Sequence, residues 1–141
     1  MIGLQASDRE GALRALAERL AASGTGHSDE VYDALRIREE AHTTALDRGV
    51  AAPHATLESV TEPVVMIATS AQPFQFGPAG TTPVRLLFVL LSPSAQAAMH
   101  IRLLARIARL ARRSGFVDAL AEAASAEDLL QRLAAAEPQV A

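Results

Sequence analysis

Cysteine and lysine are both missing from the sequence of 141 residues, and all 13 basic side chains are arginine. Without cysteine, the chain has no disulfide, no thiolate nucleophile and no cysteine-ligated zinc or iron–sulfur site. Without lysine, it has no P-loop lysine and no Schiff-base or general-base lysine. Any chemistry therefore falls to histidine, carboxylate, hydroxyl and arginine groups.

Long hydrophobic runs and an excess of positive charge are also lacking. The longest clean apolar runs, Val64–Ala68 and Leu86–Leu91, are far shorter than the roughly 20 residues that a membrane helix needs. The formal net charge of −3 argues against non-specific electrostatic binding to nucleic acid. We therefore expect one soluble, cytoplasmic domain over residues 1–141, with no membrane insertion and no nucleic-acid partner.

Helical spacing of apolar residues is found in the first part of the chain. Ser7 and Glu10 have the spacing of a capping box, which predicts that a helix begins behind Ser7. Three further elements are expected here: a short strand at Ile2–Leu4, a second helix over residues 28–40, and an irregular segment over residues 41–54.

The middle of the chain changes to β-branched apolar runs bounded by prolines, which are typical of buried strands covered on both faces. Helical spacing then returns, with an inward stripe that includes Met99 and His100. The expected elements are strands over 63–69 and 83–91, a loop or short hairpin over 72–82, a long helix from about 95 to 113, and short helices over 117–123 and 126–135. Helices, then strands, then helices indicate an α/β or α+β layered fold.

Four histidines are the groups whose ordinary pKa lies near neutral pH. His27, in a glycine-rich connection, is expected to be a solvated loop residue. His42 follows a helix, where a cation meets the negative end of the dipole. His54 comes after Pro53 with small neighbours on either side, which leaves its imidazole accessible for a functional role. His100 falls on the apolar stripe of a helix, where a buried structural histidine is the competing interpretation.

The segment Arg38-Glu-Glu-Ala-His-Thr-Thr-Ala-Leu-Asp-Arg-Gly-Val-Ala-Ala-Pro-His54 resembles a known signature. The signature is that of phosphotransferase-system enzyme IIA domains of the fructose, mannitol or nitrogen-regulatory type, and the spacing matches without gaps. A second segment, Pro83-Val-Arg-Leu-Leu-Phe-Val-Leu-Leu-Ser-Pro93 followed by His100-Ile-Arg-Leu-Leu-Ala, is similar to a second motif of the same family. The similarity extends from about Ser7 to Leu133.

The resemblance implies a mixed β-sheet sandwiched between helical layers, and it implies roles for four residues. His54 matches the histidine that the family phosphorylates, and His100 matches the second active-site histidine, which supports the phosphoryl group. Arg38 matches the signature arginine, and Thr44 matches the signature threonine. No cofactor and no metal are implied. We also expect the two imidazoles to lie side by side, since in-line transfer needs close positioning.

The loop between the signature residues departs from the family pattern. Ala45-Leu-Asp47-Arg48-Gly49 stands where the family has a loop with further glycines, so two glycines are lost and two charges are gained. If Asp47 lies near His54, its carboxylate is expected to raise the pKa of the imidazole, and Arg48 to offset that effect or to bind phosphate oxygens. In the alternative, both side chains point to solvent and belong to a docking rim.

The family resemblance predicts a phosphoryl carrier that accepts from an HPr-like phosphocarrier protein on His54 and donates to an enzyme IIB. The enzyme IIB must be another chain or domain, because this chain lacks cysteine. Three alternatives remain open: a nitrogen-type regulatory domain that binds target proteins, a degenerate member without phosphotransfer, and a metal-dependent hydrolase using His42, His54, His100 and a carboxylate. The absence of His-x-His and His-x-x-His spacing disfavours the last. The sequence does not identify a sugar.

Overall fold

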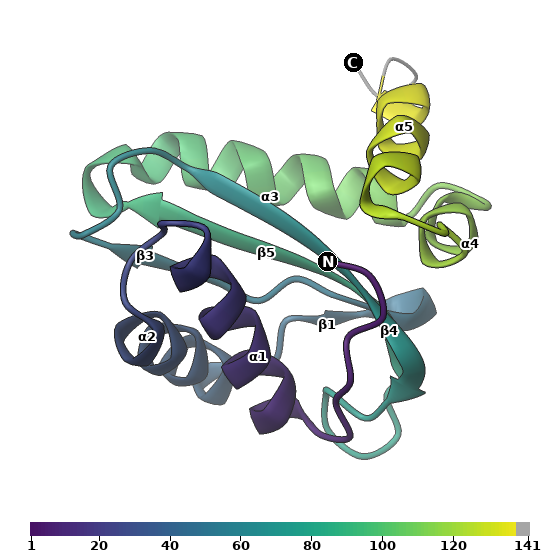
Figure 1. The fold of residues 1–141 in the computed structure, drawn as a ribbon, viewed down its shortest axis with the longest axis horizontal. Coiled ribbons are helices and arrows are strands. Elements are labelled where there is room, and N and C mark those ends of the chain that lie inside the picture. The colour runs from purple at the N-terminus through teal and green to yellow at the C-terminus, as the bar shows by residue number, and fades with distance from the viewer. Residues whose placement is uncertain (138–141) are drawn as a thin grey trace.

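The computed structural model describes residues 1–137 as an α/β fold (Figure 1). The helices are α1 (Arg9–Ala22), α2 (Ser28–Ala41), α3 (Ala97–Ala111), α4 (Phe116–Ala121) and α5 (Ala126–Ala136), with 3-10 turns η1 (Asp47–Gly49) and η2 (Ser94–Gln96). The strands are β1 (Ala45–Leu46), β2 (Val50–Ala51), β3 (His54–Leu57), β4 (Val64–Phe74) and β5 (Val84–Pro93). None of the helices within residues 1–137 has the length and apolar character needed to cross a membrane.

Strand β5 is the centre of a mixed sheet. On one side it pairs in antiparallel register with β4, and on the other it pairs in parallel with β2 near its start and with β3 near its end. All of β5 is buried except the partly exposed Arg85. The apolar run 83–91 was expected to be a buried strand, and this prediction is confirmed, since the segment packs on both faces.

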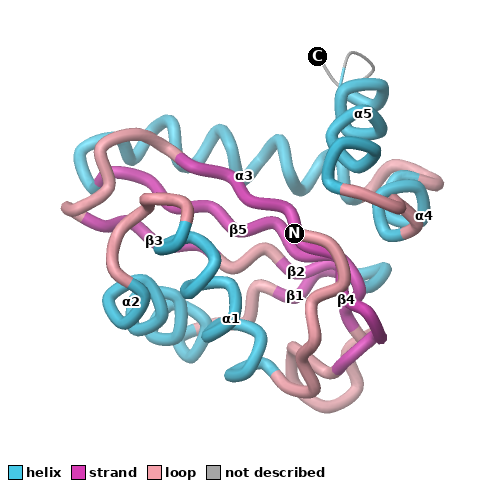
Figure 2. The backbone as a smooth tube through the Cα atoms, in the orientation of Figure 1, coloured by secondary structure: helices cyan, strands magenta, loops and turns pink. Residues whose placement is uncertain are grey.

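Helices cover both faces of the sheet (Figures 1 and 2). Helices α1 and α2 pack on one face, where alternate β5 residues Leu87, Val89 and Leu91 enter one apolar core. Helices α3, α4 and α5 pack on the other, where Leu86 and Phe88 enter a second core. This alternation is what a strand with a period of two must show between two layers. The layered fold expected from the sequence is confirmed.

The N-terminal segment differs from its prediction in two ways. Residues 2–4 form no strand; Leu4 makes a single bridge beside Ser70 of β4. The cap of α1 is Asp8 and not Ser7, because the Asp8 carboxylate accepts the Gly11 amide at 2.7 Å. Both Asp and Ser favour the N-cap position, so residue type alone did not separate the two.

Three further expectations needed correction. Residues 41–54 are not irregular throughout, because β1, η1 and β2 lie within them and β3 begins at His54. Strand β4 runs to Phe74, beyond residue 69, and it is an edge strand whose Val65 is 44% exposed, so it is not covered on both faces. Met99 was placed on the inward stripe of α3 but is 40% exposed.

Candidate functional site

His54 and His100 lie side by side, with their ring centroids 5.4 Å apart and their planes tilted by 56°. His54 is the first residue of β3, opposite Leu90 of β5, and His100 sits in the first turn of α3. The connection through η2 folds α3 back along β5, and this brings two histidines 46 positions apart in the sequence into contact. The expectation that the two imidazoles are neighbours is confirmed.

The ring of His54 has a fixed tautomer. Its Nδ1 lies 2.8 Å from the carbonyl oxygen of Ala52. A carbonyl oxygen only accepts, so Nδ1 carries the hydrogen and donates it. In the neutral ring, the lone pair is then on Nε2. The contact with Ala52 therefore leaves one defined nitrogen of the neutral His54 ring, Nε2, with a free lone pair.

His100 is held through a residue that the sequence analysis did not single out. Its Nδ1 lies 2.8 Å from the hydroxyl oxygen of Ser92, which is fully buried at the end of β5. His100 itself is only 8% exposed. The available signal was a hydroxyl side chain directly after the apolar run Leu86–Leu91, since a buried hydroxyl needs a hydrogen-bond partner.

Both imidazoles have a lowered pKa. Burial is the main cause of the lowered pKa of His54, and the positive charge of Arg38 adds to it; the hydrogen bond to Ala52 and the charge of Glu39 act in the opposite direction. Burial also lowers the pKa of His100, helped by the charges of His54 and Arg38. Both rings are therefore neutral at neutral pH, the state in which an imidazole nitrogen is a nucleophile.

Arg38 lies on α2, close enough to both imidazoles to lower the pKa of each. Its guanidinium donates to the carbonyl oxygen of His42 at 2.8 Å, which ties down the end of the helix. Glu39, the neighbour of Arg38 in the sequence, is buried and accepts hydrogen bonds from Thr44. One hydrogen bond leaves most of the five guanidinium N–H groups of Arg38 for other partners.

Thr44 is buried behind the site and does not face an open space. Its backbone amide donates to Glu39 at 2.6 Å, and its hydroxyl donates to the other oxygen of the same carboxylate. The carbonyl oxygen of Thr44 accepts the Ala52 amide at 3.0 Å, and the carbonyl oxygen of Ala52 accepts His54 Nδ1–H. Glu39 and Thr44 thus connect α2 to the backbone that orients His54.

The charged loop is not beside His54, so the electrostatic effect expected of Asp47 is wrong. The turn η1 precedes Val50, which pairs with Leu86, whereas His54 pairs with Leu90. Four residues of strand separate those positions by about 13 Å. The Asp47 carboxylate is not among the charges that shift the pKa of His54, and that pKa is lowered, not raised.

Asp47 and Arg48 are both exposed, as the docking-rim alternative required, but Arg48 reaches away from the histidines. It donates to the carbonyl oxygen of Arg112 at 2.7 Å, at the end of α3. The one glycine that the loop retains is needed: Gly49 has φ +79°, and a Cβ there would lie 3.0 Å from the carbonyl oxygen of Pro83.

The other two histidines do not join the pair. His27 is exposed and precedes α2 without forming a side-chain cap, and His42 is exposed beyond its end. Within residues 1–137, no three histidine or carboxylate side chains are placed to hold a metal ion together. The cluster that a metal-dependent hydrolase would use, with His42 beside the other two, is not assembled in this part of the chain.

Comparison with known proteins agrees with this geometry. The family model for the phosphoenolpyruvate-dependent sugar phosphotransferase system, EIIA 2, matches residues 1–136. A nitrogen regulatory protein of Bradyrhizobium diazoefficiens is 38% identical over 110 residues, which cover 77% of this chain and 71% of the relative. The fructose-specific EIIA component of a phosphotransferase system from Haloferax volcanii is 32% identical over 127 residues, covering 89% and 82%.

Solved structures share the fold. Enzyme IIA of the mannitol system from Escherichia coli, solved in complex with phosphorylated enzyme IIB, superposes with a TM-score of 0.79. The match covers 95% of this chain and 94% of that one, at 24% sequence identity. At this identity, the likeness establishes a common fold.

Proposed function

The chain belongs to the EIIA 2 family of the phosphoenolpyruvate-dependent sugar phosphotransferase system, and we propose that it is a phosphoryl carrier working as a single domain over residues 1–141. In this proposal, His54 accepts a phosphoryl group from an HPr-like phosphocarrier protein and passes it to an enzyme IIB. The observation that carries the proposal is the contact between His54 and His100, both neutral and one with a defined free nitrogen. The test is uptake from phosphorylated HPr followed by delivery to an enzyme IIB.

The transfer needs no metal and no proton release. The lone pair on Nε2 of His54 attacks the phosphorus of the donor phosphohistidine, a new N–P bond forms, and the donor nitrogen leaves with the electron pair of the bond that breaks. The hydrogen stays on Nδ1 of His54 throughout and remains hydrogen-bonded to the carbonyl oxygen of Ala52. In delivery, the acceptor group of enzyme IIB attacks the phosphorus. The bond from Nε2 of His54 to phosphorus breaks, and its electron pair returns to Nε2. What the protein must supply is position and hydrogen-bond donors.

His100 and Arg38 are the donors that we assign to the phosphoryl oxygens. If the Ser92 hydroxyl donates to Nδ1 of His100, then Nε2 of the neutral ring carries the hydrogen and can donate to a phosphoryl oxygen. Arg38 supplies a fixed positive charge near both rings. Thr44, whose hydroxyl is bonded to Glu39, supports the site by holding the backbone behind His54.

Three large apolar side chains that neighbour the site residues in the sequence are exposed. Ile37, next to Arg38, is 60% exposed, and Ile101, next to His100, is 66% exposed; Met99 is 40% exposed. A phosphoryl donor that is itself a protein must dock beside the histidine pair, and exposed apolar side chains such as these are available for that contact. HPr and enzyme IIB would then use the same surface in turn.

A nitrogen-type regulatory role is the second candidate, and the similarity to the nitrogen regulatory protein of Bradyrhizobium diazoefficiens favours it. In that role, the charge added at His54 changes the affinity for a target protein and does not feed transport. The two roles share the acceptor chemistry. Delivery to an enzyme IIB separates them, because a purely regulatory domain keeps its phosphoryl group when enzyme IIB is added.

Stability should fall on acidification because both histidines have a lowered pKa in the folded state. The unfolded chain binds more protons than the folded one from the ordinary pKa of about 6.5 down to the lowered folded value. The contribution of the two histidines to the free energy of unfolding is therefore fully present above about pH 6.5, and it is lost as the pH falls through that window. Urea unfolding at about pH 7.5 and about pH 5.5 measures it. A double variant, His54→Ala with His100→Ala, should lose less between the two pH values than the unmodified chain; an equal loss would contradict the assignment.

Replacement of Ser92 by alanine should slow phosphoryl transfer by about fivefold to tenfold, the effect of one lost hydrogen bond. The reason is that Nδ1 of His100 loses its buried partner and the tautomer of the ring is no longer fixed. Initial rates as a function of pH, with nitrogen NMR of the His100 ring, provide the measurement. Ser92→Thr keeps the hydroxyl and should restore both the rate and the tautomer. If Ser92→Ala leaves the rate and the pH profile unchanged, then Ser92 does not position His100 for phosphoryl transfer.

A further inference from the structure

Glu39 is a buried charged residue that takes no direct part in the transfer steps. It is 2% exposed, and among residues 1–137 it is the only buried residue with a carboxylate side chain. Burial of a carboxylate is costly unless its oxygens are hydrogen-bonded. Both oxygens of Glu39 accept from Thr44: the backbone amide donates to Oε2 at 2.6 Å, and the hydroxyl donates to Oε1. Thr44 therefore offsets the cost of keeping this carboxylate away from water.

A continuous chain of hydrogen bonds leads from Glu39 to the ring of His54. The carbonyl oxygen of Thr44 accepts the amide of Ala52 at 3.0 Å, and the carbonyl oxygen of Ala52 accepts Nδ1–H of His54 at 2.8 Å. Thr44 and Ala52 are only 6% and 7% exposed. Since the groups between Glu39 and the ring are shielded from solvent, water does not readily replace a bond that is lost from this chain.

The segment that contains Thr44 depends on side chains of α2 for its position. Residues 42–44 belong to no helix and no strand, because α2 ends at Ala41 and β1 begins at Ala45. Two successive residues of α2 hold this segment: Arg38 donates to the carbonyl oxygen of His42 at 2.8 Å, and Glu39 accepts from Thr44. Without Glu39, the segment lacks the contact that fixes it on its buried side.

Glu39 acts on His54 from a distance and not by contact with the reacting atoms. Its two oxygens are bonded to Thr44, so they are not directed at the imidazole. Its negative charge raises the pKa of His54, against burial and the charge of Arg38, which lower it. Two routes therefore connect Glu39 to the ring, one through hydrogen bonds and one through charge.

We propose that Glu39 is a positioning residue for phosphoryl transfer, and that it holds the backbone that fixes the tautomer of His54. The inference rests on the proposed function of His54 as the acceptor. With Thr44 bonded to Glu39, the carbonyl oxygen of Ala52 is in place to accept Nδ1–H, and Nε2 keeps the lone pair that attacks phosphorus. When the chain of bonds is broken, part of the rings carry the hydrogen on Nε2 or lie out of line, and these rings do not react.

The first variant, Thr44→Val, removes the hydroxyl and leaves the backbone amide bonded to Glu39. Uptake of the phosphoryl group from phosphorylated HPr should slow by about fivefold to tenfold, the effect of one lost hydrogen bond. In the unphosphorylated protein, nitrogen NMR of the His54 ring should show a smaller fraction of the Nδ1–H tautomer. Thr44→Ser keeps the hydroxyl and should recover both the rate and the tautomer.

The second variant, Glu39→Gln, keeps the size of the side chain but removes its charge and one acceptor oxygen. The pKa of His54 should fall below that of the unmodified chain, because the charge of Glu39 and the bond to Ala52 both raise it. Transfer should again slow by about fivefold to tenfold at about pH 7.5, where the ring is neutral in both proteins, so the change in rate reports the position and tautomer of the ring. Titration of the ring by NMR measures the pKa.

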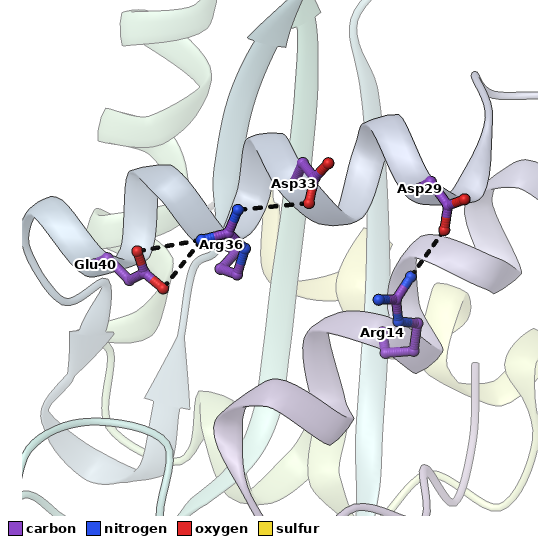
Figure 3. Close-up of polar contacts among 5 residues, drawn as sticks. All are labelled: Arg14, Asp29, Asp33, Arg36 and Glu40. Atoms are coloured by element: carbon purple, nitrogen blue, oxygen red, sulfur yellow. Dashed lines mark hydrogen bonds and ion pairs between the residues drawn. The ribbon is translucent and has the colours of Figure 1, made fainter.

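Glu40→Gln is the matched control for Glu39→Gln. Glu40 is the next residue of α2, is exposed and pairs with Arg36, as Figure 3 shows, and its replacement changes the net charge by the same amount. It should leave the transfer rate, the tautomer and the pKa of His54 unchanged.

Thr43→Val is the matched control for Thr44→Val. The hydroxyl of Thr43 accepts the amide of Ala45 at 3.1 Å and is not part of the chain of bonds that leads to His54. This variant should therefore keep the ring spectrum of the unmodified chain.

The ring measurements use the unphosphorylated protein, so they test Glu39 even if the phosphoryl group is found on another residue; in that case the proposed function fails and the positioning of the ring is still measured. The inference is overturned if Glu39→Gln and Thr44→Val keep the tautomer and pKa that His54 has in the unmodified chain. A slower rate with an unchanged ring spectrum would also contradict it, as would a Glu40→Gln variant that is as slow as Glu39→Gln.

Discussion

The variant His54→Ala is expected to take up no stable phosphoryl group from phosphorylated HPr. His54 is the one histidine of the described chain whose Nδ1 is fixed by a carbonyl oxygen, so that its Nε2 is the free nitrogen. Its neighbour His100 is 8% exposed and has its Nδ1 bonded to Ser92. Removal of the nucleophile in covalent transfer leaves nothing to carry the intermediate. Radiolabel transfer from phosphorylated HPr, followed over time, gives the result directly.

His42→Ala is the matched control for this prediction. His42 is an exposed histidine beyond the end of α2, so its removal should leave phosphoryl uptake unchanged. Thermal unfolding of both variants checks that each one is folded. If His54→Ala is folded and is still labelled at the rate of the unmodified chain, His54 is not the acceptor.

The variant His100→Ala is expected to accept the phosphoryl group more slowly, by about 100-fold, and to be impaired in passing it on. The nucleophile is still present, but the donor that lies 5.4 Å away, measured between ring centroids, is lost. Donors to the transferring oxygens act mainly on charge that develops in the transition state, so their loss lowers the rate of transfer in both directions. Rapid-quench measurement of uptake from HPr and of delivery to enzyme IIB gives both rates.

A structural role for His100 makes a different prediction, and His100→Gln distinguishes the two. Glutamine keeps a hydrogen-bond donor and much of the buried volume. It should recover part of the transfer rate if His100 donates to the phosphoryl group. If His100→Ala loses all labelling while His54→Ala keeps it, the two roles have been assigned in the wrong order.

The main elements of this fold could be predicted because their patterns are local. The apolar run from Val84 to Leu91 has the length of a buried strand, and α3 repeats its apolar residues with helical period. The strands β1 and β2 have two residues each, which is too short for any period to be visible. The extension of β4 through Pro73 is possible because β4 is an edge strand, where a missing N–H is tolerated.

The candidate site could be predicted in part, through the two motifs that end at His54 and His100. The residues that hold these rings could not, because each depends on a contact made by the folded chain. Ser92 meets His100 across the turn from β5 to α3, and Glu39 meets Thr44 at the end of α2. The predicted effect of Asp47 on His54 was wrong for the opposite reason. Asp47 is near His54 in the sequence, but β2 carries the chain along β5 between the two residues.

One measurement tests the central claim most directly: identification of the phosphorylated atom after incubation of the unmodified chain with phosphoenolpyruvate, enzyme I and HPr. Mass spectrometry of the peptides locates the residue, and phosphorus NMR separates the two nitrogens of a phosphohistidine. The structure leads us to expect an acid-labile phosphoryl group on Nε2 of His54, since Nδ1 is bonded to Ala52. The absence of an adduct, a phosphoryl group on Nδ1, or an adduct on another residue would contradict this account.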